Sequence, residues 1–356
     1  MSTHKAIVTT APRAPLSLLN VSTPSLQGNE VLIRVEWTAS TPLDMHQAES
    51  GLLVNHPQVL GDSVAGTVVG VGEAVEGVGV GDGVFTFTLH AHQEYILVPS
   101  TSVGRIPPNI SMQEAATLPD NFVTVFHTLT HDLHLSLPWP KPASYAPADS
   151  QTGFLIWGGA SSVGMYALQI LRFYGYTNVI AVASPGHHKL LGGYGARKCF
   201  DYNAADVEDA LREEIGVRYV FDTIGHLDGS VRPISRVVGM GTQVAVLLPV
   251  IVVDAREEGG PVYEMDVEGC CEWAEGVGVR GVRTYFWAEN AFFKEKLQAE
   301  IMPALLTSGD VKPNPYRAIE GATMVERAQK ALDVLKGKGA RGERLVWKVW
   351  EGEYDS

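Results

Sequence analysis

The sequence predicts an α/β protein with two parts, a β-rich barrel and a doubly wound parallel sheet. Valine-rich runs separated by glycines fill residues 61–88, as in a small barrel with tight corners. From residue 153 onward, short apolar runs alternate with helical patterns, which favours parallel strands covered by helices. A chain of 356 residues is long enough for both parts to have a core.

The composition is that of a globular protein and argues against several kinds of partner. The chain is 45% apolar and 19% charged, and its net charge of −13 disfavours nucleic acid or an anionic membrane. The apolar run at 244–253 is broken by Pro249 and is too short to span a bilayer. The first residues lack a signal-peptide core, and three cysteines cannot make a disulfide framework. We therefore expect a soluble, cytoplasmic protein.

Strand patterns dominate the first part of the chain. Residues 5–10, 30–37 and 92–98 predict strands. No helix of useful length is expected before about residue 112, so Asp44 and His46 are placed in a turn.

Helical and strand patterns alternate in the rest of the chain. Helices are predicted at 112–118, 121–134, 292–306 and 324–336. Strands are predicted at 154–157, 179–183, 218–222, 242–248 and 344–350. Four prolines between residues 138 and 147 predict a stiff loop.

Residues 153–175 form the pattern around which the second part is organised. A strand buried on both faces is predicted to end at Trp157, and a turn of small residues leads into an amphipathic helix. In Gly159-x-Ser161-x-x-Gly164, a serine stands where the usual dinucleotide-binding pattern has its second glycine. Strand, glycine turn and helix would place a helix N-terminus under a pyrophosphate. A purely structural glycine turn is the alternative.

The segment after the second strand bears on the choice of cofactor. An Asp or Glu at this place would hold the ribose 2′-hydroxyl of NAD. The chain instead has Ser184, His188 and Lys189 here and no acid. Hydrogen-bond donors and positive charge suit a 2′-phosphate, so NADPH is favoured over NADH. In the alternative interpretation, Lys189 simply begins a solvated helix face.

Several short motifs, in order along nearly the whole chain, resemble the medium-chain dehydrogenase/reductase superfamily. Thr41-Pro42-Leu43-Asp44, residues 60–66 and residues 81–85 are similar to landmarks of its quinone-reductase-like branch. Further matches are Ala115–Pro119, Gly195-Ala196 with Asp201-Tyr202, and Phe221–Gly225. The sequence is most similar to fungal members, which include stand-alone enoyl reductases that work with polyketide synthases.

The resemblance implies a GroES-like barrel domain at 1–124 and 290–356 and a Rossmann NADPH-binding domain at 125–289. It implies catalytic roles for His46 and Thr124, with Thr124 next to the nicotinamide. The implied cofactor-binding residues are Pro42, Asp44, Gly159, Ser161, Ser162, Val163, Gly164, Ser184, His188, Lys189, Tyr202, Thr223, Leu247 and Leu248. For Leu247 and Leu248, packing is a strong alternative.

Departures from the zinc-dependent relatives predict an enzyme without zinc. Those relatives have a cysteine where Pro42 and Leu43 stand and a His-Glu pair where Asp62 and Ser63 stand. A catalytic zinc needs about three protein ligands. His127, His131 and His134 have helical metal-ligand spacing, but packing and surface roles are favoured for them, and no metal is expected.

Without a Lewis acid, the scaffold suits hydride addition to an electron-poor alkene, whose enolate needs only hydrogen-bond donors and a proton. Fungal relatives often have lysine at the position of His46, and imidazole can donate a proton at neutral pH. A plain surface histidine is the alternative. The leading hypothesis is an NADPH-dependent reductase of an enoyl thioester or an α,β-unsaturated carbonyl.

Two other functions remain open on the same scaffold. One is an NADPH quinone oxidoreductase, and the other is a catalytically silent NADPH-binding partner protein. The expected partners are a small-molecule substrate or the carrier-bound acyl chain of a polyketide synthase, with a monomer or homodimer as the assembly.

Overall fold

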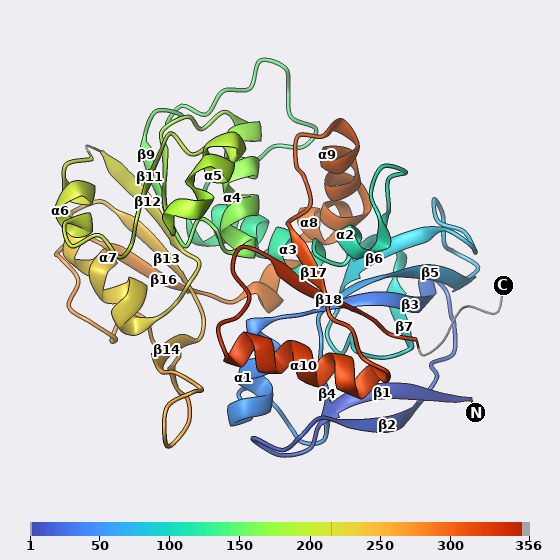
Figure 1. Ribbon diagram of the computed structural model, residues 1–356. Coiled ribbons are helices and arrows are strands. Elements are labelled where there is room, and N and C mark those ends of the chain that lie inside the picture. The colour runs from blue at the N-terminus through green and yellow to red at the C-terminus, as the bar shows by residue number, and fades with distance from the viewer. Residues whose placement is uncertain (1, 215, 351–356) are drawn as a thin grey trace. The chain divides into compact units, whose positions relative to one another are not determined.

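The computed structural model describes residues 2–214 and 216–350, which divide into two compact units (Figure 1). Unit 1 contains the described residues up to Val123, Ala255–Gly260 and those from Ala288 onward. Unit 2 contains Thr124–Asp254 and Pro261–Trp287. Each unit is described by itself.

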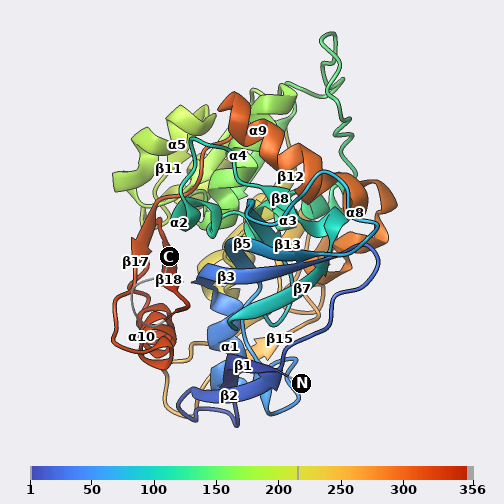
Figure 2. The same ribbon diagram turned by 90° about the vertical axis from the view of Figure 1, so that its right-hand side faces the viewer.

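Unit 1 is built around a seven-stranded sheet whose longest strand is β3 (Glu30–Ser40). Figure 2 shows β3 beside β5 (Ser63–Val71) and β7 (Tyr95–Pro99), both antiparallel to it. The sheet continues through β6 (Gly83–Phe87) to β8 (Gly104–Arg105). A smaller sheet contains β1 (Thr3–Thr9), β2 (Ser17–Ser22) and β4 (Gln58–Val59). The β-rich first domain is confirmed.

The end of the described chain returns to this sheet, one strand from its edge. Strand β18 (Arg344–Lys348) lies between β3 and β17 (Tyr316–Ala318), antiparallel to the first and parallel to the second. Trp347 is fully buried, and its Nε1 donates to Ser40 Oγ at 3.0 Å. Helix α10 (Met324–Lys336) packs against β18 on the side of α1.

Helix α1 (Pro42–Ser50) corrects the prediction that no helix of useful length precedes residue 112. Its ends are well defined, because Thr41 and Asp44 form a capping box and Gly51 ends the helix in the left-handed region. Its buried residues, Asp44, Met45, His46 and Ala48, are mixed in polarity, so no amphipathic stripe announces the helix. Asp44 and His46 are therefore helical residues.

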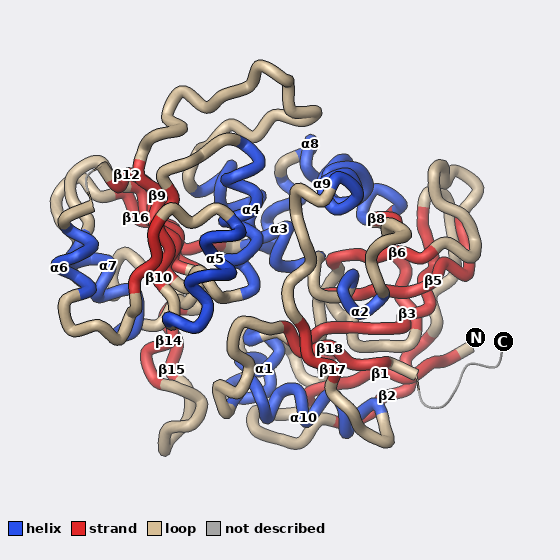
Figure 3. Tube along the Cα trace, turned by 45° about the horizontal axis from the view of Figure 1, so that its top comes forward, coloured by secondary structure: helices blue, strands red, loops and turns tan. Residues whose placement is uncertain are grey.

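Unit 2 contains a six-stranded sheet in the order β11-β10-β9-β12-β13-β16, with every neighbouring pair parallel. Figure 3 shows strands of this sheet in red and helices of the same unit in blue. The strands are β9 (Gly153–Trp157), β10 (Val179–Val182), β11 (Lys198–Phe200), β12 (Val217–Asp222), β13 (Gln243–Leu247) and β16 (Gly278–Val282). Its helices include α4 (Ser162–Tyr174), α5 (His188–Tyr194), α6 (Val207–Arg212) and α7 (Arg232–Val237). A two-stranded ribbon adds β14 (Val250–Val253) and β15 (Val262–Glu264). The doubly wound parallel sheet is confirmed.

Two predicted long helices are divided in the structure. The helix predicted at 121–134 corresponds to α3 (Pro119–His127) followed by a π-helical turn at Thr128–Asp132, and the one predicted at 112–118 is shortened to α2 (Met112–Ala115). The region 292–306 contains α8 (Ala291–Lys296), a π-helical turn at Leu297–Ile301, and α9 (Met302–Ser308). Proline can occupy a first helical turn, and Pro119 and Pro303 do so here.

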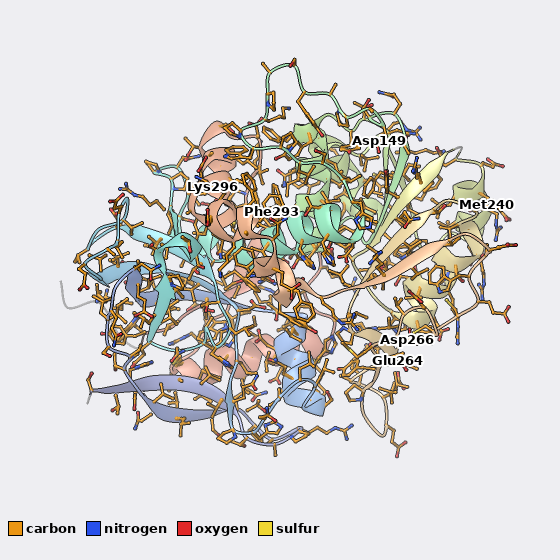
Figure 4. All side chains as sticks on the ribbon, turned by 180° about the vertical axis from the view of Figure 1, so that it is seen from behind. Asp149, Met240, Glu264, Asp266, Phe293 and Lys296 are labelled. Atoms are coloured by element: carbon orange, nitrogen blue, oxygen red, sulfur yellow. The ribbon has the colours of Figure 1, made fainter. Side chains whose placement is uncertain are left out.

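The proline-rich loop before β9 is fastened to the sheet by Asp149, which Figure 4 labels. Its two carboxylate oxygens accept hydrogen bonds from Tyr219 Oη at 2.9 Å and Tyr176 Oη at 3.4 Å. Among the described residues, no helix is both long and apolar enough to cross a membrane.

Candidate active site

The glycine turn after β9 has the close packing expected of a phosphate-binding turn. Gly158 has φ +85°, and a Cβ there would lie 2.5 Å from Thr223 Oγ1. A Cβ on Gly164 would lie 2.4 Å from the carbonyl oxygen of Gly158. Only glycine lets α4 begin this close to the turn. The N-terminal end of α4, with Ser162 and Val163, therefore follows directly on the turn, where the helix dipole favours an anion.

Ser161, which stands in place of a second glycine, caps helix α4. Its Oγ accepts a hydrogen bond from Gly164 N at 2.9 Å and donates to Thr223 Oγ1 at 2.8 Å. The Thr223 hydroxyl lies 2.9 Å from the carbonyl oxygens of both Trp157 and Gly158 and donates to them. Serine at position 161 thus ties the turn to the end of β12, so the departure from glycine has a structural role.

The carboxyl end of β12 contains a buried acid that the sequence did not single out. Asp222 is fully buried and accepts hydrogen bonds from Ile224 N at 2.9 Å, Gly225 N at 3.2 Å and Ser230 Oγ at 2.6 Å. Burial raises the pKa of Asp222 to about 6. The acid shapes the loop beyond Thr223. Asp222 is the last residue of β12, and an acid at the end of a predicted strand is a pattern from which the sequence analysis could have found it.

Leu247 ends β13 and Leu248 follows it at the same edge of the sheet, and both are half-buried. A Cβ on Gly225 would lie 2.4 Å from Leu247 O, and one on Gly281 would lie 2.7 Å from Leu248 Cδ1. Packing therefore accounts for part of their role, and contact with the cofactor remains a prediction.

The residues expected at the adenosine end are brought together in part. Ser184 Oγ donates to Tyr202 Oη at 3.2 Å, and the tyrosine is 49% exposed. Lys189 is exposed in the first turn of α5. His188 Nε2 donates to Ala183 O at 2.8 Å and so holds the loop instead of pointing a charge outward. The structure thus pairs Ser184 with Tyr202 after β10, and Lys189 follows in the first turn of α5.

Thr124 lies near the start of unit 2, on α3, and is buried. Its Oγ1 is 2.9 Å from Thr284 Oγ1, and either hydroxyl can donate. The structure thus pairs this predicted catalytic threonine with a second hydroxyl group, from a segment 160 residues away in the chain.

In unit 1, Pro42 starts helix α1 and Asp44 caps it. The Asp44 carboxylate accepts hydrogen bonds from Thr41 N at 2.8 Å, Thr41 Oγ1 at 3.1 Å and Gly61 N at 2.7 Å. The last of these ties α1 to the segment that leads into β5. Asp44 therefore has a structural role, whereas its contact with the cofactor remains a prediction.

His46 lies two residues further along α1 and is only 5% exposed. The alternative that it is a plain surface histidine is therefore wrong. It is one of four buried residues of α1, with Asp44, Met45 and Ala48. A role for His46 in catalysis remains a prediction.

A buried group of charged residues in unit 1 was missed by the sequence analysis. Arg344 Nη2 donates to Asp120 Oδ1 at 3.0 Å, and Ser63 Oγ lies 2.9 Å from that oxygen and 3.1 Å from Asp62 Oδ1. Burial raises the pKa of Asp120, and burial together with the charge of Asp120 raises the pKa of Asp62. We call Asp62, Ser63, Asp120 and Arg344 the charge cluster. Two of its members, Asp62 and Ser63, stand where zinc-dependent relatives have a His-Glu pair.

A separate cavity of about 400 Å³ in unit 2 is lined by none of the predicted site residues. Its lining includes Glu264 and Asp266, which Figure 4 labels, and Arg283. The cavity therefore shares no lining residue with the glycine turn.

Comparison with known proteins agrees with this geometry. Residues 27–125 match the alcohol dehydrogenase GroES-like domain. The trans-enoyl reductase tazE of Aspergillus terreus is 33% identical over 247 residues, covering 65% of this chain and 79% of the relative. The trans-enoyl reductase himH of Aspergillus japonicus is 28% identical over 345 residues, covering 91% of each chain.

The fold also matches a solved enoyl reductase. The CurK enoyl reductase superposes with a TM-score of 0.72 at 20% identity, covering 97% of this chain and 99% of that one. With its GroES-like domain, its parallel sheet and these relatives, the chain belongs to the medium-chain dehydrogenase/reductase family as an enoyl reductase-like oxidoreductase that takes a nicotinamide cofactor.

Proposed function

We propose that the protein is an NADPH-dependent reductase of an activated C=C bond, in an enoyl thioester or an α,β-unsaturated carbonyl, and that it works without zinc. The observation that carries the choice of cofactor is the Ser184–Tyr202 pair with exposed Lys189 beyond it. These side chains offer hydrogen-bond donors and a positive charge to a 2′-phosphate, and none of the three is an acid.

The residues of unit 2 fit such a dinucleotide. Gly158 and Gly164 let the turn pack closely, because a Cβ at either position would clash with Thr223 or with the carbonyl oxygen of Gly158. Helix α4 begins directly after this turn, and a helix N-terminus favours a pyrophosphate. When bound, the cofactor supplies the hydride. In this proposal residues 125–289 form the NADPH-binding domain, and residues 1–124 with 290–356 form the substrate domain.

The residues of unit 1 do not fit a catalytic zinc. Pro42 and Leu43 offer no side-chain ligand atom, and the charge cluster occupies Asp62 and Ser63 with Asp120 and Arg344. Reduction of a C=C bond needs no Lewis acid, since hydrogen-bond donors and a proton source are sufficient for the enolate. We assign the protonation or stabilisation of that enolate to His46.

The names of the relatives support the substrate class. Both relatives described above are trans-enoyl reductases. We propose that the acyl chain reaches this enzyme on the carrier protein of a polyketide synthase, as a partner in trans.

A substrate panel tests the reaction. Oxidation of NADPH should be fastest with an enoyl thioester or an enone, slower with quinones, and should continue after treatment with a chelator. Turnover of quinones alone would replace the proposal with a quinone oxidoreductase. Binding of NADPH with no turnover on any of the three classes would identify a silent binding protein.

Replacing Lys189 tests the cofactor assignment. Lys189→Ala should weaken binding of NADPH by about 1.5–3 kcal/mol, the range for charged hydrogen bonds, and leave NADH binding unchanged. Arg236→Ala removes one surface charge from the same unit, from a pair with Glu208 at 3.1 Å, and serves as the matched control. Equal affinity of the unmodified protein for both cofactors contradicts the assignment.

Replacing His46 tests the proton donor. His46→Ala should lower the reductive rate by about 10²–10⁴ while NADPH affinity stays nearly intact. Partial recovery in His46→Gln would indicate hydrogen bonding to the enolate, and no recovery would indicate proton donation. Because His46 is buried, the melting temperature of each variant is measured alongside, and turnover of His46→Ala at the unmodified rate would end its catalytic assignment.

A further inference from the structure

The end of helix α3 brings two histidines and an aspartate together within unit 2. The chain passes from α3 into a single π-helical turn, Thr128–Asp132, closed by a hydrogen bond from Leu133 N to Thr128 O at 2.9 Å. An α-helix has 3.6 residues per turn, so residues five apart point in different directions. A π-helical turn closes on the fifth residue, and such turns occur often at functional sites. This local widening places Asp132 on the side of His127.

The donor atoms of the three side chains converge. His127 Nε2 lies 4.0 Å from Asp132 Oδ2, and His131 Nδ1 lies 3.0 Å from Asp132 Oδ1. The imidazole rings of His127 and His131 are stacked, 4.8 Å apart and 11° from parallel. One ligand atom from each residue falls within 4.8 Å of the others.

Asp132 also has an oxygen that the rest of the described protein leaves without a hydrogen bond. Oδ2 is buried and has no hydrogen-bond partner, in a side chain that is 4% exposed. An unsatisfied buried carboxylate oxygen is costly. Arg280 on β16 and His134 interact with this carboxylate electrostatically and make no hydrogen bond to Oδ2. The oxygen that lacks a partner is the one nearest to His127 Nε2.

Access to the group is provided by His131. Its side chain is 59% exposed, whereas the side chains of His127 and Asp132 are each 4% exposed. An ion can thus arrive from solvent at His131 and be held by two buried side chains, with water completing its coordination.

We propose that His127, His131 and Asp132 form a binding site for a divalent transition-metal ion of the Zn²⁺ and Co²⁺ class. Imidazole nitrogen and carboxylate oxygen are accepted ligands for these ions, at about 2.0–2.2 Å. A small closing movement of the side chains brings the three atoms to one ion, and the ion satisfies Asp132 Oδ2. The sequence analysis noted metal-ligand spacing in His127, His131 and His134 but favoured packing and surface roles for them, and Asp132 was not considered there. The site shares no residue with the proposed substrate or cofactor sites.

The test is a titration of the tag-free, chelator-treated full chain with Co²⁺, followed by visible absorption. One Co²⁺ per chain should bind and give d–d bands, and Zn²⁺ should displace it. Because His131 is exposed, His131→Ala should fold normally and bind Co²⁺ at least ~10-fold more weakly. His226→Ala removes the other histidine of unit 2 that pairs with an aspartate, at 3.4 Å from Asp254, and should bind like the unmodified chain.

A second measurement does not depend on the visible bands. Zn²⁺ should raise the melting temperature of the unmodified chain and not that of His131→Ala, because a ligand that binds the folded state stabilises it. Binding of Co²⁺ that is unchanged in His131→Ala, or absent below millimolar concentration, overturns the proposal. Both readouts are independent of NADPH and substrate, so they leave the proposed function untouched.

Discussion

The glycine turn of unit 2 and the charge cluster of unit 1 are both buried polar networks, but they are satisfied in different ways. At the turn, two neutral hydroxyl groups, Ser161 and Thr223, satisfy backbone atoms. In the cluster, the cationic Arg344 faces two carboxyl groups, Asp62 and Asp120, whose pKa values are both raised by burial. Removing one residue from a neutral network costs the free energy of a hydrogen bond. Removing one partner of a buried ion pair costs far more, because it leaves an uncompensated charge.

The largest expected effect is in the charge cluster. Arg344→Met leaves the carboxyl groups of Asp62 and Asp120 without their cation and should lower the free energy of unfolding by about 3–5 kcal/mol. Urea denaturation measures it. Arg105→Met, which removes an exposed arginine of the same unit paired with Asp82 at 3.1 Å, should cost at most about 1 kcal/mol. Equal losses of unfolding free energy in the two variants would show that burial of the charge cluster makes no difference.

A pH effect of intermediate size is expected in unit 2. The pKa of Asp222 is about 6 in the folded protein and about 4 when unfolded, so the folded state holds the extra proton between these values. Stability from this group is therefore complete below pH 4 and is lost as the pH rises through 6, by about 2–3 kcal/mol.

Asp222→Asn isolates this contribution. The amide keeps an acceptor for Ile224 N and Gly225 N but cannot titrate, so the loss between pH 4 and pH 6 should shrink. The raised pKa values of Asp62 and Asp120 act in the same direction from unit 1, and a slope should therefore remain. An unchanged slope in Asp222→Asn would show that the acids of unit 1 account for all of it.

The smallest effect is expected at the turn. Thr223→Val removes the hydroxyl that accepts from Ser161 and should cost about 0.5–1.5 kcal/mol, measured by urea denaturation. Ser161→Ala also removes the helix cap and should cost about 0.5–2 kcal/mol. Because the two residues share one hydrogen bond, the double variant should lose less than the sum. Strict additivity would show that the bond contributes nothing.

The same contrast explains what could be predicted from the sequence. The turn is local, since Gly158 to Gly164 lie within one short segment, and the alternation of strands and helices around it indicated the parallel sheet correctly. Asp120 and Arg344 are 224 residues apart and meet only through folding, so no spacing in the sequence points to their pair.

Helix α1 and the histidines show two further limits of sequence reasoning. The capping residues of α1, Thr41 and Asp44, were visible, but its buried face mixes apolar and polar side chains and gives no period. Asp132 comes next to His127 only because the helix widens by a π turn, which an α-helical spacing cannot reveal. The roles of His46, Thr124 and Lys189 rest on the family resemblance, and the experiments above decide them.

The position of strand β18 has a consequence for how the protein is made. During synthesis every strand of the parallel sheet, from β9 to β16, leaves the ribosome before Arg344–Lys348 does. Unit 2 can therefore fold first, although the barrel begins earlier in the chain. Until β18 arrives, the end of β3 lacks this neighbour, and Asp120 lacks the guanidinium that compensates its charge. The nascent barrel is thus the stage at which a chaperone would be needed most, because a strand translated after the whole parallel sheet completes it.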